Sequence, residues 1–389
     1  MNQSYDIVVV GGGVSGLSAA LSASLNGAQT LVLERNKKIG TTVRCGEFFP
    51  SLNEAGNLFP EAKTLEKFYP ILNNDMIANK TKKIRVFSPQ NRKYEFPFDG
   101  LVLKRGKFEK TLGDEATKAG ADIQTGTNAE AVAKTGREMK ILRRNGKGET
   151  VVKAKLVIGA DGFPSMTAQR THLQNYTKDT DLALCVQLTV HGANLDEEAV
   201  EMYLGTEYAP GGYAWVIPKG RGEANVGVGA RFFCLKHGKT IVDYFTALTR
   251  NHPVVPKYLR EARFSPLIGK TLPVGGMIPR PYADGTLLVG DAAGLVVPTN
   301  GGGISTALVS GCIAGQVAAH HVNDGTPLST YENVLKKEIG KPVRRGYLYR
   351  RIGDLFMFHD RAFETLLRMI GTGNLAKTVK AEPILPFFH

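Results

Sequence analysis

Residues 5–16 read YDIVVVGGGVSG, an apolar run that leads directly into a cluster of glycines. The run Tyr5–Val10 predicts a buried parallel strand, and the small residues after Gly16 predict a helix. Residues 29–33 (QTLVL) predict a second strand, which ends at Glu34. The order of strand, glycine turn, helix, strand and acidic residue is the dinucleotide-binding fingerprint.

Each fingerprint residue has a physical task in binding a dinucleotide. Gly11 makes the tight turn, Gly13 lets the backbone approach the pyrophosphate, and Gly16 allows the helix to pack closely on the strand. Glu34 is placed to bind ribose hydroxyls, which disfavours NADP because its 2′-phosphate would meet a carboxylate. A glycine turn without function is the alternative, but the complete context favours a bound dinucleotide, either FAD or NAD.

Two further strands end in glycine turns that contain an aspartate. Residues 156–162 read LVIGADG, and residues 287–304 read LLVGDAAGLVVPTNGGGI. In the second stretch a strand leads to Asp291, and a glycine cluster then opens a helix predicted over about 304–320. Such turns occur where backbone must approach a ligand closely.

In this order, the three glycine signals resemble the FAD-binding family that includes aromatic hydroxylases, halogenases and geranylgeranyl reductases. The resemblance implies FAD as the cofactor and an α/β fold, with a Rossmann-type FAD-binding domain, an inserted antiparallel-sheet substrate domain and a C-terminal helical region. The cofactor contacts that it implies are Gly11, Gly13, Ser15, Gly16, Glu34, Arg35, Cys45, Gly46, Arg105, Ala129, Asp161, Gly290, Asp291, Gly302, Gly303 and Ile304.

The resemblance also implies roles for some of these contacts. Asp291 would bind the ribityl or ribose region, and Gly303 and Ile304 would offer helix N-terminal N–H groups to the flavin pyrimidine edge. Arg105, at a predicted helix start, is an implied cofactor contact, and Ala129 falls where the backbone would reach the adenosine end.

Two stretches narrow the resemblance to one branch of the family. Residues 43–47 (VRCGE) resemble the RCGE stretch of archaeal geranylgeranyl reductases. Residues 209–220 (APGGYAWVIPKG), followed by 224–229 (ANVGVG), resemble their YxWxFPKG…ANVGxG signature. Ile217 departs from the usual Phe and matches the WxWxIP of flavin halogenases, yet Tyr213 replaces the first Trp of that motif. The reductases therefore fit best.

The rest of the chain predicts short antiparallel strands and a helical end. The strands are expected at 84–87 and 94–98 around a turn, and then at 182–190, 199–204, 213–218 and 225–230. We expect an FAD-binding domain of residues 1–70, 100–175 and 272–327, a substrate sheet domain of 71–99 and 176–271, and a helical region of 328–389.

Composition limits the class of protein. A chain of 389 residues with 42% hydrophobic content can bury a large core without disulfides. The net charge of +13 favours an anionic partner. No basic helix with interleaved exposed aromatics and no zinc-finger spacing occurs, which argues against nucleic acid.

The four cysteines are scattered and lack metal-ligand spacing, so we expect no metal site. Without a signal peptide or a long apolar run, we expect a cytoplasmic protein, either free or bound peripherally to the inner face of the cell membrane.

The implied reaction limits the catalytic candidates. An isoprenoid C=C bond is unactivated, so its reduction needs a hydride from reduced flavin and a proton source. Cys45, Tyr203 and Tyr213 are the protic candidates, and we favour Cys45 because it lies in the narrow motif, with a packing role as the alternative. Tyr213 and Trp215 share one strand face and are expected to line an apolar wall beside the flavin, with ordinary sheet packing as the alternative. A redox pair of Cys45 and Cys312 is a weaker hypothesis.

A basic run with interleaved aromatic residues lies in the C-terminal region. It would suit a lipid with a phosphate head and an apolar tail, and a solvated helical face is the alternative. Its members are Lys336, Lys337, Lys341, Arg344, Arg345, Tyr347, Tyr349, Arg350, Arg351, Phe356, Met357 and Phe358.

The sequence thus predicts an FAD-dependent reductase that saturates the C=C bonds of geranylgeranyl chains on archaeal ether phospholipids. An FAD monooxygenase or halogenase acting on a small aromatic substrate is the first alternative, and a protein that only binds and carries prenyl groups is the second. Because no second dinucleotide fingerprint occurs, we expect an external electron donor, either NAD(P)H or a carrier such as ferredoxin.

Overall fold

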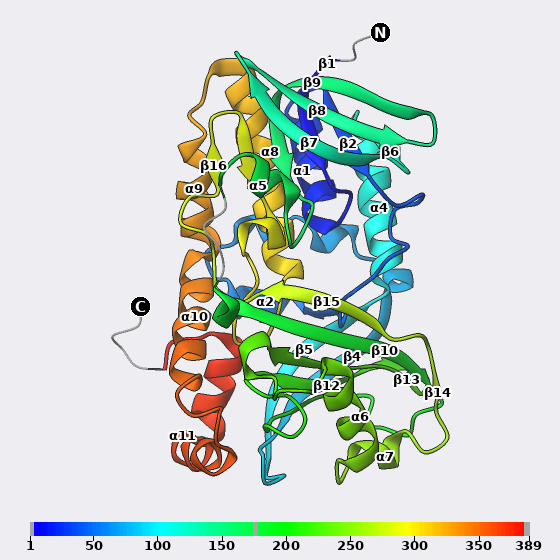
Figure 1. Cartoon of the computed structure of the whole chain (residues 1–389), viewed down its shortest axis with the longest axis vertical. Helices are drawn as coiled ribbons and strands as arrows, with labels where there is room; N and C mark the ends of the chain where they lie inside the picture. Colours follow the sequence, from blue (N-terminus) through cyan, green and yellow to red (C-terminus); the bar gives the residue numbers. More distant parts are fainter. Residues whose placement is uncertain (1–3, 174–177, 385–389) are drawn as a thin grey trace.

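The computed structural model describes residues 4–173 and 178–384, and the predicted domain ends at 1–3, 174–177 and 385–389 lie outside this part of the chain. Two large sheets form the molecule, one in the upper half of Figure 1 and one in the lower half. The C-terminal helices run along one side of both halves (Figure 1). This arrangement confirms the predicted fold class: an α/β cofactor-binding fold, an inserted antiparallel sheet and a helical C-terminal region.

The first sheet is built around the fingerprint. Strand β1 (Ser4–Val10) runs parallel to β2 (Thr30–Glu34) on one side and to β9 (Gly148–Gly159) on the other. The parallel order continues to β6 (Asp122–Thr125) beyond β2 and to β17 (Thr286–Leu288) beyond β9. Since β1 and β2 are buried on both faces, their apolar runs are continuous rather than alternating. Three helices pack on one face, with α1 (Val14–Leu25) in contact with both α4 (Arg105–Lys118) and α8 (Ile304–Asp324).

A hairpin that the sequence did not predict covers the other face of this sheet. Strands β7 (Asn128–Thr135) and β8 (Glu138–Asn145) pair with each other and continue antiparallel onto β9. Val132, Met139 and Ile141 of this hairpin pack against the sheet in a separate core cluster. Most of their neighbours on the two strands are polar or exposed, which hides the strand pattern in the sequence.

The second sheet carries the wall of the candidate site. Its strands pair in the order β14-β10-β13-β12-β11-β4-β5-β3, with β15 also on β10. All pairs are antiparallel except β11 with β4, which is parallel. The bounds are β3 Phe48–Pro50, β4 Ile77–Phe87, β5 Lys93–Leu103, β10 Leu182–His191, β11 Ala199–Tyr203, β12 Tyr213–Gly220, β13 Glu223–Arg231, β14 Arg263–Phe264 and β15 Ile268–Pro273.

Two of these strands are much longer than the sequence suggested. β4 begins before the predicted 84–87 and β5 ends after the predicted 94–98. The sequence hides these extensions because residues 77–83 are mostly polar and Asp99 and Gly100 interrupt the apolar pattern of β5. Helices α6 (Ile241–Asn251) and α7 (Val255–Tyr258) pack on the face of the second sheet that points away from the first sheet, where they bury a second apolar cluster (Figure 1).

The C-terminal region is helical, as predicted. Helix α9 (Ser329–Leu335) passes through a π-helical segment into α10 (Lys341–Gly353), and α11 (Asp360–Lys380) follows and contacts β5. Across residues 4–173 and 178–384, no helix is both long enough and apolar enough to span a bilayer.

Candidate active site

One cavity of about 830 Å³ lies between the two sheets and the C-terminal helices. At one end it is lined by the glycine turns of the first sheet, and at the other by β4, β5, β11 and α11. The volume is within the range of ligand and cofactor sites. Fourteen of the sixteen predicted cofactor contacts line this cavity, as do Tyr213 and Trp215; the two other contacts, Gly16 and Gly290, pack against the lining residues Gly11 and Ser15.

The fingerprint glycines shape the nucleotide end of the cavity. Gly11 has φ +107°, and a Cβ there would lie 2.4 Å from the carbonyl oxygen of Ala160, so only glycine fits this turn. A Cβ on Gly16 would lie 1.9 Å from the carbonyl oxygen of Gly11, which requires glycine for the close packing of α1 on the turn. Gly13, in contrast, has no heavy atom within 4 Å of a Cβ position, so space is open in front of it.

The first turn of α1 is available to an anion. Gly13 is its N-cap and supplies no side-chain hydrogen bond, and the turn carries no acidic residue. The N–H groups and the positive end of the helix dipole therefore face the open space at Gly13. Helix α8 begins in the same way at Gly303, again with no side-chain cap and no acid in its first turn. These two uncapped helix starts fit the pyrophosphate and the pyrimidine edge of FAD.

Glu34 is fixed at the border of the nucleotide end. Its carboxylate accepts hydrogen bonds from the backbone N–H of Gly12 at 2.7 Å and of Asn36 at 2.8 Å, and from the Asn36 side chain at 2.6 Å. Asn36 was missed in the sequence, although it follows the predicted acid by two positions. Arg35 and Ala129 also line the cavity.

Asp161 borders the cavity, but its carboxylate bonds to the protein. It accepts from the Ser165 hydroxyl at 2.6 Å and from the Thr167 backbone N–H at 2.8 Å, at the start of the short helix α5 (Met166–Arg170). Burial raises its pKa, against the opposing effect of these hydrogen bonds. The side chain therefore fixes the turn that carries it, and a cofactor contact at this position would come from the backbone.

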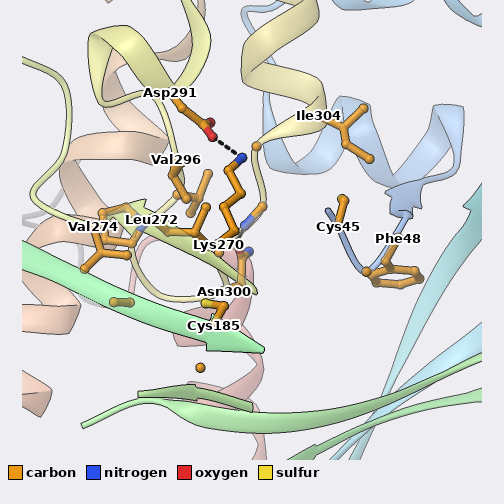
Figure 2. A pocket seen from close by; sticks show the side chains of 18 of the residues that line it. Cys45, Phe48, Cys185, Lys270, Leu272, Val274, Asp291, Val296, Asn300 and Ile304 are labelled. Carbon is orange, nitrogen blue, oxygen red and sulfur yellow. Dashed lines mark hydrogen bonds and ion pairs between the residues drawn. The ribbon is translucent and has the colours of Figure 1, made fainter. Parts of the chain in front are cut away.

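Asp291 has a partner that the sequence did not reveal. Lys270 of β15 crosses from the second sheet, and its Nζ lies 2.5 Å from Asp291 Oδ2 (Figure 2). Both side chains are partly exposed to the cavity, at 28% and 15%. The stretch around Lys270, IGKTLP, carries no motif, so this cross-sheet ion pair was not predictable from local pattern.

The predicted glycine cluster at residues 301–303 also lines the site. Gly302 donates its N–H to Asn300 Oδ1 at 2.8 Å, and Gly303 comes within 3.5 Å of Asp291 Oδ1 at its Cβ position. A Cβ on Gly290 would lie 2.8 Å from the Ser15 hydroxyl, so these two residues pack against each other.

Cys45 lies in a charged corner of the cavity. Its sulfur accepts a hydrogen bond from the Glu47 backbone N–H at 3.2 Å, and the Arg105 guanidinium is within hydrogen-bonding reach. Arg105 also pairs with Glu109 at 2.9 Å. Burial opposes the charge on Arg105, but Cys45 and Glu109 outweigh it and raise its pKa. Burial likewise raises the pKa of Glu109.

The aromatic wall stands opposite this corner. The rings of Tyr213 and Trp215 are 5.9 Å apart on one face of β12, as their spacing predicted. Tyr213 donates its hydroxyl proton to the carbonyl oxygen of Asn300, and burial raises its pKa. Trp215 donates to Asn225 Oδ1 at 2.7 Å.

The glycines of β13 make room for this wall. A Cβ on Gly227 would lie 2.2 Å from Trp215 Cζ2, and one on Gly229 would lie 3.2 Å from the sulfur of Cys185. Cys185 also lines the cavity, and burial raises its pKa to about 12.

Two other candidates lie away from the cavity. Tyr203 packs in the second apolar cluster, stacked on Phe87 and hydrogen-bonded to Glu201, so it is not placed to donate a proton to a ligand. Cys312 is in α8, interacts with Ser22 of α1 and does not line the cavity, so it forms no pair with Cys45 in this structure.

The far end of the cavity is apolar and extends under α11. Apart from Met357, which belongs to the run predicted for lipid contact, the sequence did not identify these wall residues, because their apolar spacing on the helix and strands is also that of an ordinary core. They are Phe48, Ile84, Val86, Phe98, Val200, Met202, Leu204, Met357, Phe363, Leu366, Leu367 and Ile370.

The basic run predicted for lipid contact is not one continuous surface. Arg350 is buried in an ion pair with Asp181, Arg345 donates to the carbonyl oxygen of Ala381, and Lys336 pairs with Glu332. Lys337, Lys341, Arg344 and Arg351 remain exposed. Within the described ranges, no group of three or more His, Cys, Asp or Glu side chains is arranged to hold a metal ion.

Comparison with known proteins agrees with this geometry. Residues 181–261 match the family described as the geranylgeranyl reductase catalytic domain, and residues 6–168 match FAD dependent oxidoreductase. The chain is 35% identical to digeranylgeranylglycerophospholipid reductase 2 of Methanothermobacter thermautotrophicus, over 97% of this chain and 94% of the relative. It is 34% identical to the digeranylgeranylglycerophospholipid reductase of Methanocaldococcus jannaschii, over 95% and 92%.

Solved structures show the same architecture. A geranylgeranyl bacteriochlorophyll reductase-like protein of Thermoplasma acidophilum superposes with a TM-score of 0.85 at 29% identity, covering 97% of this chain and 96% of that one. A flavin-dependent brominase shares the fold alone, with a TM-score of 0.71 at 16% identity over 99% and 96%.

Proposed function

The chain belongs to the digeranylgeranylglycerophospholipid reductase family of FAD-dependent oxidoreductases, and from this premise we propose how its residues saturate the C=C bonds of geranylgeranyl chains on archaeal ether phospholipids. The observation that carries the proposal is a single cavity that joins a nucleotide end to a long apolar end. The monooxygenase and halogenase alternative has less support, because those structures share only the fold.

At the nucleotide end, FAD would be bound by backbone N–H groups and by two acidic side chains. The uncapped starts of α1 and α8 would bind the pyrophosphate and the pyrimidine edge, Glu34 the ribose, and Asp291 the ribityl region. Arg105, held by Glu109, would add a positive charge beside the cofactor. Reduced FAD supplies the hydride for the reaction, so the chain itself must provide an apolar site and a proton.

The apolar end selects and shields the prenyl chain. The side chains named above for this end are apolar and exclude water, which suits a polyisoprenoid and disfavours a small polar aromatic. Tyr213 and Trp215 form the wall where the apolar end meets the nucleotide end, so a double bond lying on this wall faces the cofactor site. Gly227 and Gly229 keep the wall flat enough to admit a chain.

Cys45 is the side chain that we propose as the proton source. It borders the cavity, and both of its polar neighbours, the Glu47 backbone N–H and the Arg105 guanidinium, are donors, so its own proton is free for the substrate. Tyr213 is less suited because its hydroxyl proton is already donated to Asn300. A Cys45→Ser variant keeps a protic group and should retain more activity than Cys45→Ala.

The substrate reaches the cavity from a membrane surface, and the electrons come from a separate donor. Five exposed apolar residues gather near the α10 end of the cavity, where the rings of Phe233 and Phe358 lie 5.6 Å apart. We call them the apolar rim: Phe232, Phe233, Ile352, Leu355 and Phe358. An exposed group of this kind is typical of a membrane or partner contact. The donor would be NAD(P)H or a ferredoxin-like carrier, since the sequence holds one dinucleotide fingerprint.

Product analysis under anaerobic conditions tests the proposed function. Dithionite-reduced protein is incubated with a digeranylgeranyl glycerophospholipid, and the lipid is analysed by mass spectrometry. The proposal expects pairs of hydrogens to be added and no oxygen or halogen. A lipid of unchanged mass, with oxygen incorporated into a small aromatic when air is admitted, would overturn it.

A further inference from the structure

Arg231 is a buried cation with hydrogen-bond donors that the protein leaves unpaired. It is the last residue of β13, borders the cavity and is only 2% exposed. Its Nη1 donates to Asp354 Oδ1 at 3.0 Å, but Nε and Nη2 are buried and have no hydrogen-bond partner in the described chain. A buried donor without a hydrogen-bond partner destabilises the protein. An acceptor from outside the chain that bonded to Nε and Nη2 would therefore be stabilising.

Arg231 lies at the end of β13, the strand whose glycines pack against the Tyr213–Trp215 wall. Alternate residues of a strand share a face, so Arg231 extends the row of Gly227 and Gly229, which lie beneath Trp215. Gly229 is paired with Tyr213 across the strands, two residues before Arg231. The guanidinium with its two unpaired donors is therefore placed at the end of the surface on which the prenyl chain would lie.

A second buried arginine stands beside the first. Arg350 of α10 also borders the cavity and is 6% exposed; it donates to the carbonyl oxygen of Thr180 at 2.9 Å and to Asp181 Oδ1 at 2.7 Å. Its Nε has no partner among the described residues. Burial first, and then the charge of Arg350, lower the pKa of Arg231. Two carboxylates, Asp181 and Asp354, hold the arginines in place but leave three nitrogens unpaired.

This pair lies at the rim where a lipid headgroup would remain. Phe233 of the apolar rim covers the Arg231 guanidinium at 5.3 Å and is itself 38% exposed. Ile352 and Leu355, close to Asp354 in the chain, are also exposed. A lipid with its tails in the apolar end of the cavity would leave its polar head between these two groups.

We propose that Arg231, held by Asp354 and adjacent to Arg350, binds the phosphate of the lipid substrate. The inference rests on the proposed function and adds to it the site that recognises the headgroup. The Nε–Nη2 edge of a guanidinium presents two parallel donors that match two oxygens of a phosphate. Anchoring the phosphate at the end of β13 fixes which double bonds of the chain lie on the Tyr213–Trp215 wall.

Two lipids that differ only in the phosphate test the proposal. Digeranylgeranylglyceryl phosphate and digeranylgeranylglycerol are compared as substrates of the full-length, FAD-loaded protein and of Arg231→Lys. The lysine keeps the charge and the reach to Asp354 but loses the two-donor edge. Arg361→Lys, on an exposed arginine of α11, is the matched control. FAD content and Tm are measured for every variant.

The proposal expects Arg231→Lys to raise KM for the phosphate lipid about tenfold, with kcat, FAD content and the activity on digeranylgeranylglycerol unchanged. Equal losses on both lipids would overturn it. Should Arg231→Lys fail to fold, the wild-type protein still decides: it should use the phosphate lipid at least tenfold better than the alcohol, and equal use would contradict the proposal.

Inorganic phosphate distinguishes a headgroup site from a site for free phosphate. The proposal expects weak competition with the phosphate lipid, at millimolar concentration, that disappears in Arg231→Lys. Tight phosphate binding without any preference between the lipids would assign the site to free phosphate and overturn the headgroup role. Failure of the wild-type protein to reduce either lipid would instead contradict the proposed function.

Discussion

Glycines allow other atoms to approach closely in both halves of the molecule, but the nearest atoms belong to backbone in one half and to a side chain in the other. Where α1 meets α8, a Cβ on Gly311 would lie 2.2 Å from the carbonyl oxygen of Ser15, and one on Gly315 would lie 2.2 Å from that of Ala19. Under the aromatic wall, a Cβ on Gly227 would meet the Trp215 ring at the same 2.2 Å. In the first case the neighbour is backbone, which cannot move without separating two helices. In the second the nearest neighbour is a side chain, which can turn into the cavity, and the backbone carbonyl oxygen of Val186 lies farther away, at 2.8 Å.

The difference separates what holds the cofactor from what shapes the substrate site. Contacts of backbone with backbone make the nucleotide end rigid, and a ligand there meets N–H groups whose positions the fold determines. Side-chain contacts make the substrate end adjustable. Substitutions in the two sets of glycines should therefore have different consequences, which the predictions below address.

The largest effect is expected for Gly311→Ala. The added methyl group forces α8 away from α1, and overpacking of this kind destabilises by about 3 kcal/mol. Because α1 and α8 both begin at the cofactor site, bound FAD should be lost as well, which the visible spectrum of the purified protein reports. Gly56→Ala in α2 (Leu52–Leu58) is the control, since nothing lies within 4 Å of its Cβ position. Retention of full FAD content by Gly311→Ala would remove the distinction between the two glycine sets.

Gly227→Ala should have a smaller effect of another kind. The Trp215 ring must turn away, with a loss of stability of about 2 kcal/mol, while the FAD content stays unchanged. Lipid reduction should fall, because the wall on which the chain lies is displaced. Tryptophan fluorescence reports the movement directly, since Trp215 is the one tryptophan of the chain. Loss of FAD from this variant would contradict the separation of the two ends.

Lys270→Met tests the ion pair that links the two halves. Without the lysine, the Asp291 carboxylate is uncompensated beside the cofactor, and we predict that the FAD dissociation constant rises about tenfold. The double variant Lys270→Met/Asp291→Asn removes the uncompensated carboxylate charge and should restore part of the affinity for FAD. Fluorescence titration of the apoprotein with FAD measures both. An unchanged affinity in the single variant would show that the pair does not support the cofactor.

The smallest effect concerns pH and the far side of the substrate sheet. His252 is buried beside Tyr203 and Tyr208, and burial lowers its pKa to about 4. Its Nδ1 accepts from the backbone N–H of Val254 at 3.2 Å, so the folded protein keeps it neutral. The unfolded chain takes up a proton near pH 6.5, whereas the folded chain takes it up only near pH 4. The stability that neutral His252 contributes is therefore complete above pH 6.5 and is lost as the pH falls towards 4.

We expect the histidine to lower the free energy of unfolding by about 1 kcal/mol at pH 6 relative to pH 8. Urea unfolding of the wild type and of His252→Asn, which keeps an acceptor, measures the difference. The asparagine variant should show a shallower loss over this pH range. Identical pH dependences would mean that His252 is not the titrating group.

The sequence was informative where function depends on local backbone. The glycines and acids of the cofactor end are close in sequence to the strands that carry them, so strand, turn and helix could be predicted together, and α4 begins at the predicted Arg105. Even Tyr213 and Trp215 could be paired, because a strand places alternate residues on one face.

The substrate end was less predictable because distant segments meet there. Lys270 reaches Asp291 only through the packing of the two sheets, and Phe363 and Leu367 face the cavity only because α11 folds back over β5. The unpaired nitrogens of Arg231 follow from three-dimensional packing, which no spacing in the sequence reports. The β7–β8 hairpin was missed because its strands are mostly polar, although Ala129 of β7 was predicted as a cofactor contact.

The most direct test of the account is an anaerobic single turnover of the FAD-loaded protein. The flavin is reduced with dithionite, the excess is removed, and a digeranylgeranyl glycerophospholipid is added while flavin absorbance and lipid mass are recorded. The account predicts reoxidation of the flavin without oxygen, with one C=C bond saturated for each flavin reoxidised. A flavin that stays reduced until air is admitted, beside a lipid of unchanged mass, would contradict it.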